Sequence, residues 1–269
     1  MSTVPTVQWV INEMEAWAPT FWAEENDNVG LLIGNPSSPI KKILVALDAT
    51  DAIVEEAIAD NYNCIITHHP ITYAPLKRIT ADCTIGRKML ALARHDISLY
   101  SAHTNLDKAP GGVNDCLAEK LGINNTIPLV DDAFGDAVGL GRIGELPTEI
   151  TLRELAERVK KSLGLKDIRY SGDLSHKIKK VAMCGGSGMS FWHSAKNKNC
   201  DVYITGDAKY GDTLGVLASG LCLLDITHYS GENIIVEAIV KRLRTKAKQD
   251  GISLEINATT IDGQAFHTI

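Results

Sequence analysis

Three short apolar runs in this chain have the length of a buried strand, and each is followed by histidine at its carboxyl end. Segments with the apolar spacing of helices lie between these runs. Such an alternation is typical of parallel sheets whose two faces are covered by helices. The runs and their histidines are residues 64–67 with His68 and His69, residues 97–102 with His103, and residues 221–227 with His228. The sequence therefore predicts an α/β fold with mainly parallel sheets.

The strand–helix alternation occurs twice, with a polar stretch at residues 122–136 between the two occurrences. We expect two α/β domains, residues 1–130 and 131–269, with a related order of strands and helices. Either a duplication within the chain or a chance recurrence, which is common in α/β folds, explains this repeated order of strands and helices. The further strands expected are residues 42–47, 138–146, 168–170, 180–184, 202–205 and 253–260, and the helices are residues 7–18, 51–60, 85–95, 113–121, 151–162, 190–197, 209–218 and 232–247.

Composition narrows the class of protein. With 269 residues, 45% of them hydrophobic, the chain can bury a sizeable core. Its net charge of −6 provides no basic field, so nucleic acid is not favoured as a partner. The six cysteines show no Cys-x-x-Cys spacing, and a disulfide framework is not expected in a chain of this length. There is no secretory leader pattern and no apolar run of about 18 residues, so we expect a cytoplasmic protein without a membrane partner.

The histidines at the strand ends predict a metal site, because parallel α/β sheets gather ligands beyond the carboxyl ends of their strands. Two of the histidines have a carboxylate four residues later: Asp107 after His103 and Glu232 after His228. Imidazoles with carboxylates suit Zn²⁺, Mn²⁺ or Fe²⁺, and the absence of thiolates from the pattern favours an open, catalytic type of site. Neighbouring residues of an extended chain point to opposite sides, so we expect His68 and His69 to serve two adjacent ions.

Other candidates have two readings each. His103 could be a metal ligand, or it could orient a ligand or act as an acid/base residue beside Asp107. The glycine-rich segment 184–188 could meet an anion with its backbone N–H groups, or it could be an ordinary turn between strand and helix. Residues 27–31 and 205–207 are expected to be loop segments. Residues 205–207 follow another strand and could line the cleft that holds the expected metal site. The remaining histidines have structural readings; His95, for example, ends an expected helix, where a cation is favourable.

Several motifs together resemble a known family. They are Asp27-Asn-Val-Gly-Leu, Thr67-His-His-Pro, His103-Thr-Asn-Leu-Asp107, Gly186-Ser-Gly188, Ile204-Thr-Gly-Asp207 and Thr227-His-Tyr-Ser-Gly-Glu232, in this order. From about residue 5 to 260 the chain resembles the GTP cyclohydrolase 1 type 2 homologues, the bacterial YbgI-like proteins. The resemblance implies two α/β domains, a dinuclear metal centre in the cleft between them, and a ring-like homohexamer.

Carried over by motif, the metal ligands implied by the resemblance are His68, His69, Asp107, His228 and Glu232, with Glu232 as the bridging ligand. They would hold two divalent ions per chain, with Zn, Mn or Fe as candidates. One departure concerns the stretch after Thr-Gly-Asp. Many relatives have a histidine there, where this chain has Tyr210-Gly-Asp212.

The leading functional hypothesis is a metal-dependent hydrolase that acts on a nucleotide or a related small molecule, with His103 as its proton-transferring residue. The family name implies attack on the purine ring of GTP, but a phosphoester or another C–N bond is equally compatible with such a centre. The alternative is a metal-binding regulator or scaffold without turnover.

Overall fold

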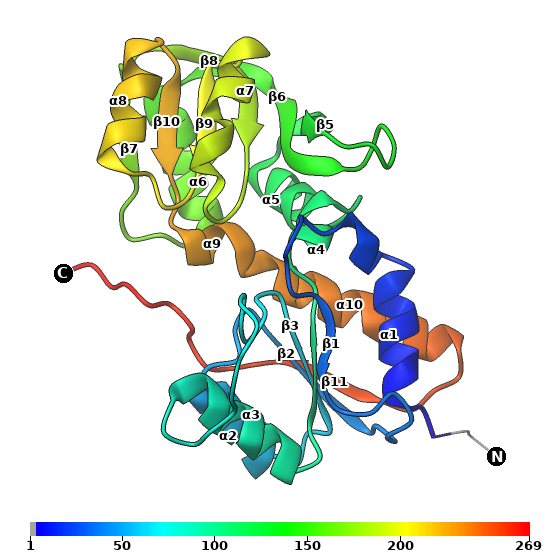
Figure 1. Cartoon of the computed structure of the whole chain (residues 1–269). Coiled ribbons are helices and arrows are strands. Elements are labelled where there is room, and N and C mark those ends of the chain that lie inside the picture. Colours follow the sequence, from blue (N-terminus) through cyan, green and yellow to red (C-terminus); the bar gives the residue numbers. More distant parts are fainter. Residues whose placement is uncertain (1–3) are drawn as a thin grey trace. The chain divides into compact units, whose positions relative to one another are not determined.

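The computed structural model describes residues 4–269, and this part of the chain forms two compact units (Figure 1). The first unit comprises the chain up to Leu106 together with Ile235–Gly263, and the second comprises Asp107–Ile234 with Gln264–Ile269. This division differs from the boundary expected between residues 130 and 131. The polar stretch chosen there contains strand β5 (Asn124–Asp131), an edge strand of the second sheet, and the C-terminal helix and strand belong to the first unit.

The first unit has a five-stranded sheet in the order β1-β4-β3-β2-β11. Strands β4, β3, β2 and β11 are parallel, and β1 runs antiparallel to β4. The strands are β1 (Gly30–Ile33), β2 (Lys42–Ala46), β3 (Cys64–Thr67), β4 (Ser98–Ser101) and β11 (Glu255–Ala258). The helices are α1 (Val7–Glu15), the single 3-10 turn η1 (Thr20–Trp22), α2 (Asp51–Ala59), α3 (Thr84–Arg94) and α10 (Ile234–Gln249).

Helices on both faces of this sheet explain its continuous apolar strands. Figure 1 shows α2 and α3 on one face and α1 with α10 on the other. All four residues of β3 and of β4 are buried, as parallel strands covered on both sides require. Helix α2 begins at Asp51, and Thr50 caps it, since the Thr50 hydroxyl accepts a hydrogen bond from the Ile53 N–H at 3.3 Å.

The second unit has a six-stranded sheet in the order β5-β6-β8-β9-β10-β7. Only β8, β9 and β10 are parallel to one another, so both sheets are mixed rather than mainly parallel. The further strands are β6 (Gly139–Thr151), β7 (Arg169–Ser171), β8 (Lys177–Met183), β9 (Val202–Thr205) and β10 (Cys222–Asp225). The α/β fold class is confirmed. The antiparallel strands β1 and β5 were not predicted, because the three apolar residues of β1 lie between Gly30 and Gly34 and most of β5 is exposed or half-buried.

Helices cover this second sheet in two groups. α5 (Val113–Leu121) and α6 (Leu152–Leu163) pack in one apolar core, and α7 (Trp192–Asn197) and α8 (Tyr210–Ala218) pack in another. The capping box predicted at Thr151 and Glu154 is present at the start of α6. Short helices follow two strand ends: α4 (Thr104–Lys108) follows β4, and α9 (His228–Glu232) follows β10. A 3-10 turn, η2 (Gly188–Phe191), precedes α7.

The two sheets share one topology, which favours duplication over chance. Strand order β1-β4-β3-β2 in the first unit has the same form as β7-β10-β9-β8 in the second. Asn63 accepts hydrogen bonds from the N–H groups of residues 41–42 at 3.0 and 3.3 Å. Asp201 accepts them from residues 179–180 at 2.8 and 2.7 Å. Asn63 therefore corresponds to Asp201.

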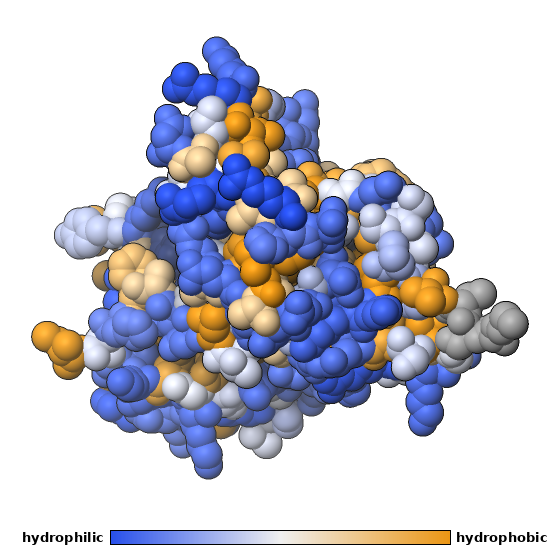
Figure 2. All heavy atoms as spheres, turned by 90° about the horizontal axis from the view of Figure 1, so that it is seen from below, coloured by the Kyte–Doolittle hydropathy of each residue, from blue (hydrophilic) through white to orange (hydrophobic). Residues whose placement is uncertain are grey.

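The surface of the molecule is mixed in polarity. On the face shown in Figure 2, hydrophilic residues predominate and the hydrophobic residues form small separate patches. Among the described residues, no helix combines the length and the apolar character that crossing a membrane requires.

Candidate metal centre

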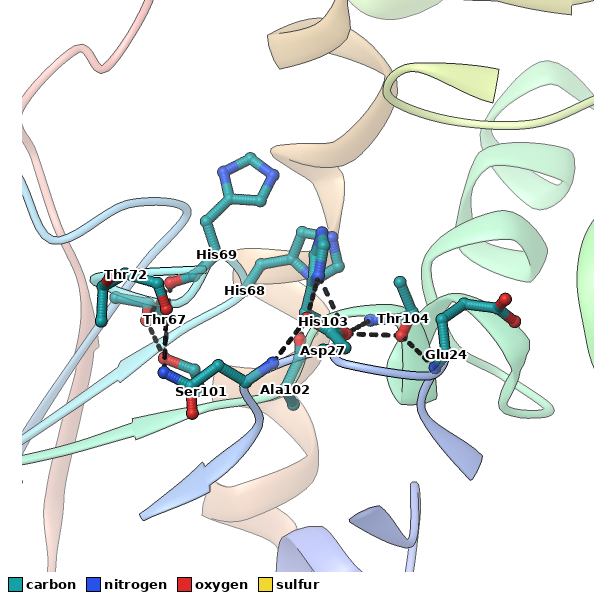
Figure 3. A network of polar contacts seen from close by, with 11 residues as sticks. Glu24, Asp27, Thr67, His68, His69, Thr72, Ser101, Ala102, His103 and Thr104 are labelled. Carbon is teal, nitrogen blue, oxygen red and sulfur yellow. Dashed lines mark hydrogen bonds and ion pairs between the residues drawn. The ribbon is translucent and has the colours of Figure 1, made fainter. Parts of the chain in front are cut away.

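His68 and His69 follow the last residue of β3 at the carboxyl end of the first sheet (Figure 3). His68 is fully buried, and His69 is nearly so. The hydroxyl of Thr67 donates to the His69 carbonyl oxygen at 2.7 Å and lies 2.8 Å from the Ser101 hydroxyl. These bonds hold the chain in a bend directly after the strand, so the alternation of side chains along an extended strand ends at Thr67.

The imidazole rings of His68, His69 and His103 converge. Ring centroids are 5.0 Å apart for His68 and His69, 5.2 Å for His68 and His103, and 5.5 Å for His69 and His103. One ring nitrogen of each lies within 4.8 Å of the other two. The expectation that His68 and His69 point to opposite sides is therefore corrected. Three imidazole nitrogens this close could hold a divalent ion.

Oxygen atoms fix the orientation of His68 and His69. His68 Nδ1 donates to the carbonyl oxygen of Ala102 at 2.8 Å, and His69 Nδ1 donates to a carboxylate oxygen of Asp48 at 2.8 Å. A carbonyl oxygen can only accept, so the proton of His68 lies on Nδ1. Its Nε2 then carries the lone pair that a metal needs, which is the arrangement usual for metal-binding histidines.

His103 is oriented by Asp27, a residue of the loop before β1 (Figure 3). Its Nδ1 lies 2.9 and 3.0 Å from the two carboxylate oxygens of Asp27. The same carboxylate accepts hydrogen bonds from the N–H of Thr104, at 3.1 Å, and from its hydroxyl. The Asp27 side chain is 5% exposed and that of His103 is 19% exposed. His103 therefore keeps a fixed orientation with Nε2 directed away from Asp27, which suits either a ligand or a proton-transferring group.

The surroundings of Asp27 stabilise its charged form. Burial by itself would raise the pKa of this carboxyl, but hydrogen bonds from His103 and Thr104 and the charge on His103 outweigh it. They hold the pKa of Asp27 well below its ordinary value. Asp27 is thus a permanent anion at neutral pH, and His103 has a constant partner.

In the second unit, α9 presents His228 and Glu232 on one face. His228 Nε2 lies 2.9 Å from a carboxylate oxygen of Glu232, as expected for residues four apart in a helix. His228 Nδ1 lies 2.8 Å from a carboxylate oxygen of Asp207. Both ring nitrogens of His228 therefore face carboxylates. Either a proton or a metal ion on Nε2 would satisfy this arrangement.

The backbone around His228 adopts conformations that are rare for residues other than glycine. Thr227 has φ 65° and Asp207 has φ 52°. For a β-branched residue such as threonine a positive φ is a true outlier, and such strain gathers at functional sites. Local hydrogen bonds hold this strained backbone in place. The Thr227 N–H donates to Asp225 at 3.0 Å, and the Thr227 hydroxyl donates to the Ser230 hydroxyl at 3.0 Å.

Gly186 allows the backbone of the turn after β8 to approach Glu232. A Cβ at this position would lie 1.9 Å from a carboxylate oxygen of Glu232 and 3.4 Å from His228 Nε2. A Cβ at Gly206 would lie 2.7 Å from the Gly186 carbonyl oxygen and from the backbone nitrogen of His228. The glycine-rich segment 184–188 therefore lets the chain pack tightly behind two candidate ligands.

Asp107, the third candidate ligand of the second unit, is half-buried in α4. Its carbonyl oxygen accepts a hydrogen bond from the Asn114 side chain at 3.0 Å, and the Asn114 oxygen accepts one from the Gly185 N–H at 3.0 Å. Asn114 thus links α4 to the glycine turn behind Glu232. Burial raises the pKa of the Cys184 thiol, and the charges of Asp107 and Glu232 raise it further. Both effects favour the protonated form of the Cys184 thiol.

Other residues singled out in the sequence lie in structural roles. His95 is the C-cap of α3, as predicted. His193 stacks on Trp192 at a ring distance of 3.6 Å. Gly211, where many relatives are expected to have histidine, lies in the first turn of α8 with open space around it.

Three carboxylates that orient the histidines were not predicted in that role. Asp48 directly follows the run 42–47, Asp207 follows the run 202–205 with one residue between, and Asp27 lies in a loop. The signal available for Asp48 and Asp207 was their place at strand ends, where the histidines also lie. Pairing Asp27 with His103, 76 residues away, depends on the antiparallel strand β1.

An α/β fold that gathers imidazoles and carboxylates at its strand ends defines a protein with a candidate metal site. The sequence matches the Duf34/NIF3 (NGG1p interacting factor 3) family over residues 5–264, and the chain belongs to this family. A relative from Clostridium perfringens, named a GTP cyclohydrolase 1 type 2 homolog, is 40% identical over 241 residues, which cover 90% of this chain and 92% of the relative.

Solved structures agree with the fold. A Bacillus cereus protein related to NIF3 superposes with a TM-score of 0.94 at 28% identity, with full coverage of both chains. The Staphylococcus aureus protein SA1388 gives a TM-score of 0.92 at 31% identity, covering 98% of this chain and all of the other. The resemblance to the GTP cyclohydrolase 1 type 2 homologues is thereby confirmed.

We expect Asp27 to titrate below the ordinary range of carboxyl groups and to return towards that range in a His103→Ala variant. The folded-state pKa is lowered relative to an unfolded value of about 3.9. Its contribution to stability is therefore complete above that pH and is lost as the pH falls through the folded pKa. Carbon-detected NMR titration of the aspartate carboxyls measures this. Titration of Asp27 near pH 4 in the wild type would contradict the arrangement.

We expect Gly186→Ala to disturb the candidate ligands more than Gly164→Ala does. The two glycines share a left-handed φ, +61° and +66°, but a Cβ at Gly164 meets nothing within 4 Å. Gly164→Ala should therefore cost only the backbone penalty of about 1–2 kcal/mol. Gly186→Ala should in addition displace Glu232 and lower divalent-metal binding at least about tenfold. Thermal unfolding and metal titration of both variants measure the difference; equal metal affinity would refute the role of Gly186.

Proposed function

We propose that this protein is a dinuclear metal-dependent hydrolase that acts on a nucleotide or a related small molecule. The observation that carries the proposal is the convergence of His68, His69 and His103, with one ring nitrogen of each within 4.8 Å of the others. The donor pair His228 and Glu232 adds a carboxylate that could bridge two cations. Family membership and the name of the relatives support the same class of protein.

The proposed ligands are His68, His69, Asp107, His228 and Glu232, holding two divalent ions per chain. The donor set fits such ions, because it consists of imidazoles and carboxylates. Zn²⁺, Mn²⁺ and Fe²⁺ are the candidates. When bound, a pair of such ions polarises a substrate oxygen and lowers the pKa of a bound water.

The protein's own contribution to the reaction would come from His103 and Asp27. Asp27 holds the imidazole through Nδ1 and keeps its charge at neutral pH. His103 Nε2 would thereby be the atom that exchanges a proton during the reaction, as a general acid and base does. Its ring lies 5.6 Å from that of Tyr73, which limits how the imidazole can turn.

We expect purified protein to carry close to two divalent ions per chain, and Glu232→Gln to lose at least one of them while the fold survives. The substitution keeps the shape of a side chain that is 5% exposed but removes its charge. Two dications about 3.5–4 Å apart repel strongly without a bridging anion. Glu237→Gln, an exposed residue of α10, is the matched control. Elemental analysis and calorimetric metal titration measure the outcome; wild-type affinity for two ions in Glu232→Gln would reject this ligand set.

Hydrolysis itself is tested by screening the metal-loaded protein against nucleotides and phosphoesters, with Glu232→Gln as the inactive control. Turnover that disappears in the variant supports the proposal. Two bound ions without turnover on any of these substrates would instead support a metal-binding regulator or scaffold.

We also propose that the chain assembles as a homohexamer, on the basis of the family resemblance. Light scattering coupled to size-exclusion chromatography at micromolar concentration should give about six times the chain mass of 29.2 kDa. A monomer under these conditions would contradict the assembly.

A further inference from the structure

A small pocket of about 230 Å³ opens in the second unit beside the edge strand β7. Pockets for drug-sized ligands are about 300–1,000 Å³, so this one suits a single ring system rather than a whole nucleotide. Its lining comes from β7, β10 and the start of α8. The residues that matter below are Arg169, Tyr170, Ala208, Tyr210, Leu223 and Asp225.

Two tyrosines give the pocket its aromatic character. Tyr170 is 50% exposed and Tyr210, the first residue of α8, is 81% exposed. Leu223, also in the lining, is buried and apolar. Aromatic rings left this exposed around an apolar residue can still gain contact area when a flat ligand stacks on them.

The charges of the pocket favour a neutral ring over an anion. Arg169 forms an ion pair with Asp225, whose side chain is only 4% exposed. The guanidinium charge is therefore compensated within the pocket, and a phosphate group would meet the Asp225 carboxylate as well. A guanidinium held in this way still offers outward N–H groups to the oxygen and nitrogen atoms of a heteroaromatic ring, as arginine does with purines.

The same residues connect the pocket to the candidate metal ligand His228. Asp225 accepts a hydrogen bond from the Thr227 N–H at 3.0 Å and one from the Ala208 N–H at 3.3 Å. Thr227 precedes His228, and Ala208 follows Asp207, which holds the His228 ring. A ligand in the pocket would thus lie against the backbone that positions His228.

We propose that this pocket binds a planar heteroaromatic ring of the size of a nucleobase. The ring stacks on Tyr170 and Tyr210 and receives hydrogen bonds from Arg169. The statement that this ring is part of the substrate rests on the proposed function. The binding of the ring to the pocket is independent of it. The pocket would then select the substrate by its base, while the reacting group lies towards His228.

The test measures binding of guanosine and adenosine to the full chain by calorimetry, both as purified and after treatment with a chelator. Nucleosides carry the ring but no phosphate, and the chelated protein separates ring binding from metal binding. We expect saturable binding in both states. Tyr210→Ala should weaken it about tenfold or more, because stacking of a base on an aromatic ring contributes on that order.

Two variants make the result specific. Tyr210→Phe keeps the ring and should bind within about threefold of wild type. Leu217→Ala removes an apolar side chain on α8 that is 50% exposed and does not line the pocket, so it should leave binding unchanged. Ribose 5-phosphate, which has no base, should not compete.

Equal affinity in Tyr210→Ala and wild type, or no saturable binding of either nucleoside, would overturn the ring pocket and leave the proposed metal centre intact. Competition by ribose 5-phosphate would overturn it as well, because it would show a site for the phosphate. Loss of metal binding in Glu232→Gln has no bearing on nucleoside binding to the chelated protein.

Discussion

The hydrogen bond from Nδ1 of each candidate histidine to an oxygen atom is the interaction on which the site depends. The acceptors are Ala102 for His68, Asp48 for His69, Asp27 for His103 and Asp207 for His228. An imidazole held at Nδ1 can turn very little, and its Nε2 is left as the atom for chemistry. The acceptors lie at strand ends or in the loop before β1, so the arrangement of the strands determines where each Nε2 points.

The second unit positions His228 with a strained backbone, whereas the first unit positions its histidines without such strain. The first unit presents two histidines after β3. The Ala102 N–H donates to the Thr67 carbonyl oxygen there, as the Ile226 N–H donates to the Thr205 carbonyl oxygen in the second unit. By this correspondence Gly206 occupies the place of His68, and Asp207 that of His69. In the first unit this strand end therefore supplies a pair of histidines. In the second unit it supplies a glycine that lets the backbone segments pack closely and an aspartate that orients His228, and Asp207 and Thr227 there have a strained, positive φ.

Much of the fold could be predicted from local patterns. The buried parallel strands were found because they are continuous apolar runs, and β3 and β9 were placed to the residue. Strands β1 and β5 were not found, since the three apolar residues of β1 lie between Gly30 and Gly34 and most of β5 is exposed or half-buried. The expected domain boundary differs from the division into two compact units for a related reason: the polar stretch taken as the boundary contains strand β5, most of which is exposed or half-buried.

The candidate site, like the fold, could be predicted only in part. His68, His69, His103 and His228 could be recognised because each follows an apolar run, and the i, i+4 spacing of His228 and Glu232 translates directly into contact. The convergence of His68 and His69 could not, because it follows from hydrogen bonds of Thr67 that bend the chain. The role of Asp27 is also set by tertiary contacts, since it meets His103 only when the sheet has formed.

The most direct test of the account is X-ray absorption spectroscopy of the zinc-loaded protein. Histidine and carboxylate ligands predict nitrogen and oxygen neighbours at about 2.0–2.2 Å. A second metal about 3.5–4 Å away is predicted as well. Sulfur scattering at about 2.3 Å, or a spectrum without a neighbouring metal, would contradict a dinuclear centre built from these residues.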